Sequence, residues 1–85
     1  MTTKKRAGDA VAVVDLSLRR GDGLGLVRRI RSHFPPLKLI ALSVHEEKNA
    51  EFAAIEAGAN GFVLKRSIAT DLLPTIDAVL AGSAT

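Results

Sequence analysis

The stretch Ala10-Val-Ala-Val-Val-Asp-Leu-Ser-Leu18 decides how this chain of 85 residues folds. It begins as an apolar run without alternation, which is typical of a strand covered on both faces in a parallel sheet. The run ends on one carboxylate, Asp15, and Gly21 and Gly23 follow as turn residues. Open α/β sheets build their sites in this way, with a strand that carries a polar group to its carboxyl end before a loop and a helix.

Two further strand–helix units follow the first one. Asp22 is a candidate N-cap for the first helix, and Pro35-Pro36 ends that helix because proline cannot continue the hydrogen-bond ladder. Strands that alternate with helices in βαβαβα order predict an α/β fold with a three-layer-type parallel sheet and right-handed crossovers. The expected elements are strands over 10–15, 37–43 and 62–65, and helices over about 23–33, 46–57 and 71–80.

Apolar side chains at helical spacing predict which face of each helix is buried. Gly58 is expected to close the second helix with a positive φ, and Gly82 to close the last. Pro74 is expected near the first turn of the last helix, where a missing amide costs least. The residues predicted to face inward are Leu24, Val27, Ile30, Phe52, Ile55, Leu72, Leu73, Ile76, Val79 and Leu80.

The composition predicts one small domain with an aliphatic core. The chain is 47% hydrophobic and has no Cys, Trp or Tyr, so disulfides and thiolate metal sites are excluded. We expect a flexible N-terminal arm over 1–9, the domain over 10–82 and a tail over 83–85. No run reaches the roughly 18 apolar residues of a membrane span, and no apolar segment follows the N-terminal charges as in a secretory signal. The sequence therefore predicts a cytoplasmic protein without a membrane segment.

Basic residues give the chain a net charge of +3 and gather in and after the first predicted turn. A nucleic-acid interface is one interpretation of this cluster, and a solvated helix face is the other. No aromatic residues interleave with the arginines, which argues against stacking on single strands and favours the solvated face. The cluster comprises Arg19, Arg20, Arg28, Arg29 and Arg31.

The three predicted strands end on a carboxylate, a hydroxyl and an ammonium: Asp15, Ser43 and Lys65. Each is one strand–helix repeat from the next, so all three are expected at the same edge of the sheet. A carboxylate can accept a phosphoryl group and hold it as an aspartyl phosphate. The lysine can pair with phosphoryl oxygens as a point charge, and the serine hydroxyl can donate to another oxygen.

The local sequences around these residues resemble the receiver domain of bacterial two-component response regulators, above all receivers coupled to helix-turn-helix output domains. The resemblance covers about residues 10–82 and implies a flavodoxin-like receiver fold with an incomplete N-terminal part. The matching stretches are Val14-Asp-Leu-Ser-Leu18 with Asp22-Gly23, Leu39-Ile-Ala-Leu-Ser43, and Ala57-Gly-Ala-Asn-Gly-Phe-Val-Leu-Lys65.

The resemblance implies a role for each residue of the site. Asp15 is the phosphoacceptor, Ser43 is the switch hydroxyl that contacts the phosphate, and Lys65 pairs with the phosphate. Phe62 takes the place of the switch aromatic residue, and the backbone carbonyl of Ser17 joins Asp15 as a magnesium ligand. The implied partner is a sensor histidine kinase, and the implied function is phosphorelay signal transduction.

Two departures from the family pattern set the further expectations. Arg19 stands where the family usually has proline, which makes the turn less rigid. Only 14 residues precede Asp15, so the paired acidic residues that hold magnesium in the family have no counterpart. Magnesium prefers octahedral oxygen ligands and cancels charge in phosphoryl transfer. We therefore expect Mg²⁺ binding to be weak or absent, and phosphorylation to be slow or absent.

The same departure leaves the strand over 10–15 with an unpaired, valine-rich edge, which is a template for pairing with another chain. It also removes a packing neighbour of the last helix, which is expected to expose Leu73, Ile76 or Leu80. This predicts a homodimer through that edge under a two-fold axis. An alternative function follows, in which a degenerate receiver dimerises or binds a partner without being phosphorylated. A nucleic-acid binder remains as a third hypothesis. No general base lies near a predicted substrate pocket, so the chain is not expected to be an enzyme.

Overall fold

The computed structural model describes residues 10–17, 23–44 and 48–82 of the chain. Their order of strands and helices is the predicted βαβαβα order. The elements are β1 (Val11–Asp15), α1 (Gly23–His33), β2 (Lys38–Ser43), α2 (Lys48–Ala57), β3 (Gly61–Leu64), the 3-10 helix η3 (Lys65–Ser67) and α3 (Ile68–Leu80). The predicted cap at Asp22, the departure at Arg19, the arm over 1–9 and the tail over 83–85 lie outside the described residues.

The three strands form a parallel sheet in the order β1-β2-β3. Asp15 pairs with Leu42 and Ser43 pairs with Leu64, so the carboxyl ends of the strands lie level with one another. The middle strand is covered on both faces, because each residue from Leu39 to Ser43 is no more than 8% exposed. An apolar run without alternation is the pattern that such a strand requires.

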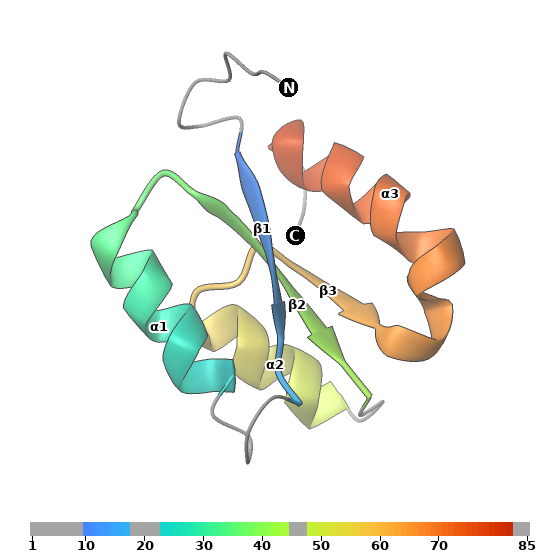
Figure 1. Ribbon diagram of the computed structural model, residues 1–85, viewed down its shortest axis with the longest axis horizontal. Helices are drawn as coiled ribbons and strands as arrows, with labels where there is room; N and C mark the ends of the chain where they lie inside the picture. The colour runs from blue at the N-terminus through green and yellow to red at the C-terminus, as the bar shows by residue number, and fades with distance from the viewer. Residues whose placement is uncertain (1–9, 18–22, 45–47, 83–85) are drawn as a thin grey trace.

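Helices cover both faces of this sheet, as Figure 1 shows, with α1 and α2 on one side and α3 on the other. Alternate residues of β2 enter two separate cores, which confirms the three-layer arrangement. The buried residues on the α1 and α2 side are Val14, Val27, Leu39, Ala41, Ala54, Ala57 and Ala59. Those on the α3 side are Ile40, Leu42, Val63 and Val79.

The predicted inward face of α1 is confirmed, and that of α2 is wrong. Val27 is fully buried, and Leu24 and Ile30 pack against the same core. On α2, Phe52 and Ile55 are 66% and 42% exposed. Helix α2 instead packs through the small residues Ala54 and Ala57, one turn apart, because alanine lets a helix approach the core closely. Large apolar side chains are the stronger signal in the sequence, and here they indicate the wrong face.

The C-cap prediction for α2 is confirmed, since Gly58 has a φ of 124° and its amide donates to the Ile55 carbonyl at 3.0 Å.

Helix α3 begins three residues earlier than predicted, at Ile68, because η3 leads directly from β3 into it. Lys65 belongs to η3, so β3 covers Gly61–Leu64 and not the predicted 62–65. The expected place of Pro74 in the first turn is wrong, since this proline lies inside the helix and leaves the Thr70 carbonyl without a helical amide. The prediction for Gly82 agrees with its φ of 80° at the position that follows Ala81, the C-cap residue of the helix.

The predicted buried stripe of α3 is partly wrong. Val79 is 1% exposed, and Leu72 and Ile76 pack against the same core at helical spacing. Leu73 and Leu80 each follow a residue of this stripe by one position, which turns them by about 100° around the axis. They are 69% and 41% exposed, which agrees with the exposure expected where the last helix lacks a packing neighbour. None of the helices described here has the length and apolar character that crossing a membrane requires.

Candidate functional site

The structure brings two of the three predicted site residues into direct contact. The Nζ atom of Lys65 lies 2.7 Å from Oδ2 of Asp15, and the two side chains are 39% and 25% exposed. Because β2 lies between β1 and β3, this ion pair spans the end of the middle strand. We call the group formed by Asp15, Ser43 and Lys65 the carboxyl edge.

The second oxygen of Asp15 is held by the backbone. The amide of Ser17 donates to Oδ1 at 2.8 Å and forms a short turn directly after β1. The hydrogen bond from Lys65, followed by the one from the Ser17 amide, holds the pKa of Asp15 below its ordinary value of 3.8, and partial desolvation opposes the shift. Asp15 is therefore ionised at neutral pH, which is the state that a nucleophile requires.

Ser43 ends the middle strand between the other two residues. Its side chain is 1% exposed, whereas the ion pair beside it remains open to solvent. A hydroxyl can donate one hydrogen bond and accept others, so it can adapt to an anion at this edge. The carboxyl edge thus brings together a carboxylate, an ammonium and a hydroxyl at the ends of three neighbouring strands, which is the placement that the strand–helix repeat predicted.

The predicted magnesium ligands do not form a complete magnesium site. They are the Asp15 carboxylate, whose two oxygens already accept from Lys65 and Ser17, and the backbone carbonyl of Ser17. Across residues 10–17, 23–44 and 48–82, no three acidic, histidine or cysteine side chains gather in a metal-binding group. Mg²⁺ demands near-octahedral oxygen coordination, and this carboxylate and carbonyl are only part of such a ligand set.

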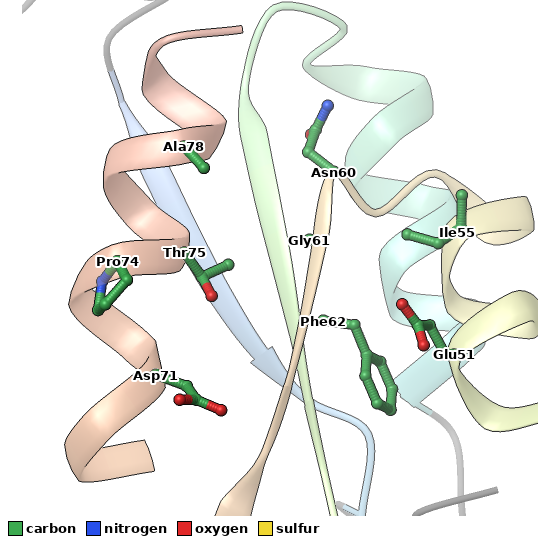
Figure 2. Close-up of a pocket in the computed structure, with 9 residues that line it drawn as sticks. All are labelled: Glu51, Ile55, Asn60, Gly61, Phe62, Asp71, Pro74, Thr75 and Ala78. Atoms are coloured by element: carbon green, nitrogen blue, oxygen red, sulfur yellow. The ribbon is translucent and has the colours of Figure 1, made fainter. Parts of the chain in front are cut away.

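Phe62, the expected switch residue, lines a pocket of about 300 Å³ between α2, β3 and α3. Figure 2 shows its ring extending from β3 toward Glu51, while Asp71 and Thr75 line the opposite wall. The ring also packs against the core on the α1 and α2 side. Phe62 is therefore half-buried on the strand that leads to Lys65.

The opposite edge of the sheet holds an arginine whose place the charge pattern does not predict. That pattern favours a solvated basic face for Arg31, yet its guanidinium donates to four acceptors from segments far apart in the chain. They are the Gly58 carbonyl (2.8 and 3.1 Å), the Pro35 carbonyl (2.7 Å), the Leu37 carbonyl (2.6 Å) and Oδ1 of Asn60 (2.6 Å). One signal was present, because Arg31 follows the fully buried Val27 by four residues and so lies on the same helix face.

Comparison with known proteins places the chain in one family. The family model described as the response regulator receiver domain matches residues 2–77. The transcriptional regulatory protein RcsB of Escherichia coli (strain K12) is 33% identical over 75 residues, which cover 85% of this chain and 35% of RcsB. The Fimbriae Z protein of Salmonella typhimurium is 35% identical over 72 residues, with 85% and 34% covered. The chain thus spans about a third of the length of these curated relatives.

Solved structures give the same result for the fold. The isolated REC domain of RcsB from Salmonella enterica serovar Typhimurium, in the apo form, matches with a TM-score of 0.78 and 33% identity, over 88% of this chain and 55% of that one. A LuxR-family two-component response regulator from Aurantimonas sp. SI85-9A1 matches with a TM-score of 0.79 and 32% identity, over 87% and 53%. These matches confirm the predicted flavodoxin-like receiver architecture.

Proposed function

The chain belongs to the response regulator receiver domain family, and on that premise we propose that it is a phosphorelay module in which Asp15 accepts the phosphoryl group. The observation that carries this proposal is the contact of 2.7 Å between Lys65 and Asp15 at the ends of two strands that flank a third. The proposed phosphodonor is a sensor histidine kinase, and the proposed location is the cytoplasm. The chain itself is proposed to have no enzymatic turnover and no direct contact with nucleic acid.

The proposed reaction uses three groups of the carboxyl edge. One oxygen of the Asp15 carboxylate attacks the phosphorus atom of the donor, and a carboxylate O–P bond forms. The bond between phosphorus and the donor's leaving atom breaks, and its electron pair leaves with that atom, which takes a proton from solvent. Lys65 then moves its charge from the carboxylate to the phosphoryl oxygens, and the Ser43 hydroxyl donates to another of them.

We propose that this reaction is slow in the present chain. Phosphoryl transfer to an anionic carboxylate depends on a cation that neutralises the developing charge. The cation that the receiver family implies for this role is Mg²⁺. The ligands at Asp15 and Ser17 leave most of the ion's coordination to water, so Mg²⁺ binding is expected to be weak. Lys65 alone supplies positive charge at the proposed acceptor from within the carboxyl edge.

The test is labelling with a small phosphodonor such as acetyl phosphate, followed by intact mass and peptide mapping, with and without Mg²⁺. We expect slow incorporation at Asp15 that depends little on Mg²⁺ and is lost in Asp15→Asn. The matched control is Asp77→Asn, which changes an exposed acid on α3 and should label like the parent. Fast labelling that requires Mg²⁺ would contradict the impaired reaction, and labelling that persists in Asp15→Asn would contradict the acceptor.

A second candidate function is a dimerising or partner-binding module that works without phosphorylation. Within the described residues, β1 pairs with β2 alone, and Val13 on this edge strand is 43% exposed. On the neighbouring layer Leu73 is 69% exposed. Unpaired strand edges with apolar side chains pair readily with a second strand, so the proposed assembly is a homodimer through the edge over 10–15.

Sedimentation velocity at high micromolar concentration tests this assembly. We expect a dimer for the parent chain and a monomer for Val13→Lys, because lysine on an edge strand opposes strand pairing. Phe52→Lys is the matched control, since it removes an apolar side chain that is 66% exposed and belongs to α2, not to β1. A monomeric parent chain, or a Val13→Lys variant that dimerises like the parent, would refute the interface.

A further inference from the structure

Asn60 lies directly before β3 and binds both backbone hydrogen-bonding groups of one residue on β2. Its amide donates to the Leu39 carbonyl at 2.7 Å, and its side-chain Oδ1 accepts from the Leu39 amide at 2.9 Å. The side-chain oxygen thus takes the place that a backbone carbonyl would hold in the ladder. This extends the pairing of β3 with β2 by one position at its amino end.

The orientation of the Asn60 amide group is fixed by its neighbours. Oδ1 accepts from Nη2 of Arg31 at 2.6 Å as well as from the Leu39 amide, so two donors address the same oxygen. A flipped amide would turn a donor toward both, which excludes the alternative assignment. The same Nη2 donates to the Gly58 carbonyl at 2.8 Å, and Nη1 of Arg31 donates to the carbonyls of Pro35 and Leu37. Arg31 is therefore a fixed support for Asn60. We call Arg31, Leu39 and Asn60 the amino edge.

The register of β3 against β2 depends on few contacts, because β3 has four residues. A slip by one residue would turn Val63, which is 2% exposed, away from its core, so apolar packing excludes it. A slip by two residues would keep each side chain on its own face, and the apolar pattern opposes it less. Such a slip would move Lys65 by about 7 Å along the strand, far more than a contact of 2.7 Å with Asp15 tolerates.

We propose that Asn60, supported by Arg31, is a positioning residue that fixes the β2–β3 register and so places Lys65 beside Asp15. That the Lys65–Asp15 pair forms only in the correct register follows from geometry alone. That the pair serves phosphorylation rests on the proposed function. Asn60 and Lys65 bound the same short strand at opposite ends. A hydrogen-bonded amide at one end thereby sets where a charge lies at the other.

Carbodiimide cross-linking tests the inference, because it joins a carboxylate and an amine without a spacer and requires their direct contact. The readout is the yield of the amide between Asp15 and Lys65, measured by peptide mass mapping at a temperature where circular dichroism shows each variant to be folded. In Asn60→Ala we expect the yield to fall about fivefold, the factor that corresponds to one typical net hydrogen bond. Asn60→Asp keeps an acceptor oxygen for Leu39 and Arg31 and should restore most of the yield.

Asn49→Ala is the matched control, since Asn49 is an exposed asparagine on α2, and it should cross-link like the parent. If Asn60→Ala does not fold, Arg31→Lys replaces it, because one ammonium cannot hold both Gly58 and Asn60 as the fork does. An unchanged yield in the folded variant would overturn the inference. Cross-linking involves no phosphoryl group, so a chain that fails to label at Asp15 leaves this result unaffected, and the two proposals fail separately.

Discussion

The two edges of the sheet hold their charged side chains in different ways. At the carboxyl edge, Asp15 and Lys65 form one ion pair that is 25% and 39% exposed. At the amino edge, the guanidinium of Arg31 donates to three backbone carbonyls and one side-chain oxygen, and most of these bonds are partly buried. Exposed ion pairs contribute little to stability, whereas leaving buried carbonyls unsatisfied is costly.

This difference separates the part of the molecule that can exchange partners from the part that cannot. In the proposed reaction Lys65 leaves Asp15 for a phosphoryl oxygen, and this exchange is favoured because the ion pair is open to solvent and both partners of Lys65 are anionic oxygens. Arg31 has no such freedom, since four acceptors would lose their donor together. We infer that the amino edge maintains the fold and that the carboxyl edge is free to react.

The largest effect is expected from Arg31→Met, which keeps much of the apolar stem and removes the donors. The carbonyls of Pro35, Leu37 and Gly58 would lose their donor, and Asn60 would lose its support. We expect a loss of about 2–3 kcal/mol in unfolding free energy and a fall in Tm of about 10–20 °C for a domain of this size. Thermal and urea unfolding followed by circular dichroism measure both quantities.

Arg28→Met is the control for this variant, because Arg28 is an exposed arginine on the same helix. Substitutions at such positions change stability by no more than about 0.5 kcal/mol. Equal losses in the two variants would mean that the hydrogen bonds of Arg31 carry no special weight. The inferred division between the two edges would then fail.

The next effect is expected from Gly23→Ala, which tests whether the turn directly after β1, next to the carboxyl edge, is rigid. A Cβ atom at Gly23 would lie 2.4 Å from the Cα atom of Leu16, directly after Asp15, and backbone cannot move aside as a side chain can. We expect a loss of about 2 kcal/mol, the usual cost of crowding a well-packed site. Gly25→Ala, at an exposed position of the same helix, should instead stabilise by about 0.5–1 kcal/mol. A Gly23→Ala variant as stable as the parent would show that this turn is loose.

The sequence predicted the carboxyl edge because its signals are local. Asp15, Ser43 and Lys65 each end an apolar run, and the repeat of strand and helix returns such ends to one edge. The amino edge could not be predicted in this way. Arg31 is held by acceptors that come from the loop after α1 and the loop after α2, and only the folded chain brings these together. Asn60 has the composition of a turn, and its bonds to Leu39 depend on the register of a strand that follows it.

The errors in the helices have a similar origin. Periodicity fixes which residues share a face, and packing decides which face the sheet accepts. On α2 the sheet accepts Ala54 and not Phe52, because close approach there excludes a large ring. The early start of α3 depends on η3, a single turn that no local signal in the sequence indicated.

A smaller effect is expected from Lys65→Met. The ion pair it removes is exposed on both sides, so the change in the urea midpoint at neutral pH should be well below that of Arg31→Met. Phosphoryl labelling of Asp15 should decrease strongly even though the urea midpoint changes little, because the phosphoryl oxygens lose their counter-charge. A Lys65→Met variant that unfolds as easily as Arg31→Met would make the carboxyl edge a structural element and contradict its proposed role.

The smallest effect concerns pH. The pKa of Asp15 in the folded chain lies below 3.8 because Lys65 and the Ser17 amide bind the ionised form. In the unfolded chain Asp15 takes up its proton near that ordinary value, so its contribution to stability is present above 3.8 and is lost as the pH falls through the folded-state pKa. In Lys65→Met the first of these causes is removed and the pKa of Asp15 should rise toward 3.8. The parent should therefore lose more stability than the variant on acidification, and the two urea midpoints should converge.

Carboxyl-carbon NMR titration of Asp15 measures the pKa directly. In an Asp15→Asn background, Lys65→Met should no longer alter how the urea midpoint falls at acidic pH. A pKa that stays depressed without Lys65 would assign the shift to the Ser17 amide, and the ion pair would then have no part in preparing the nucleophile.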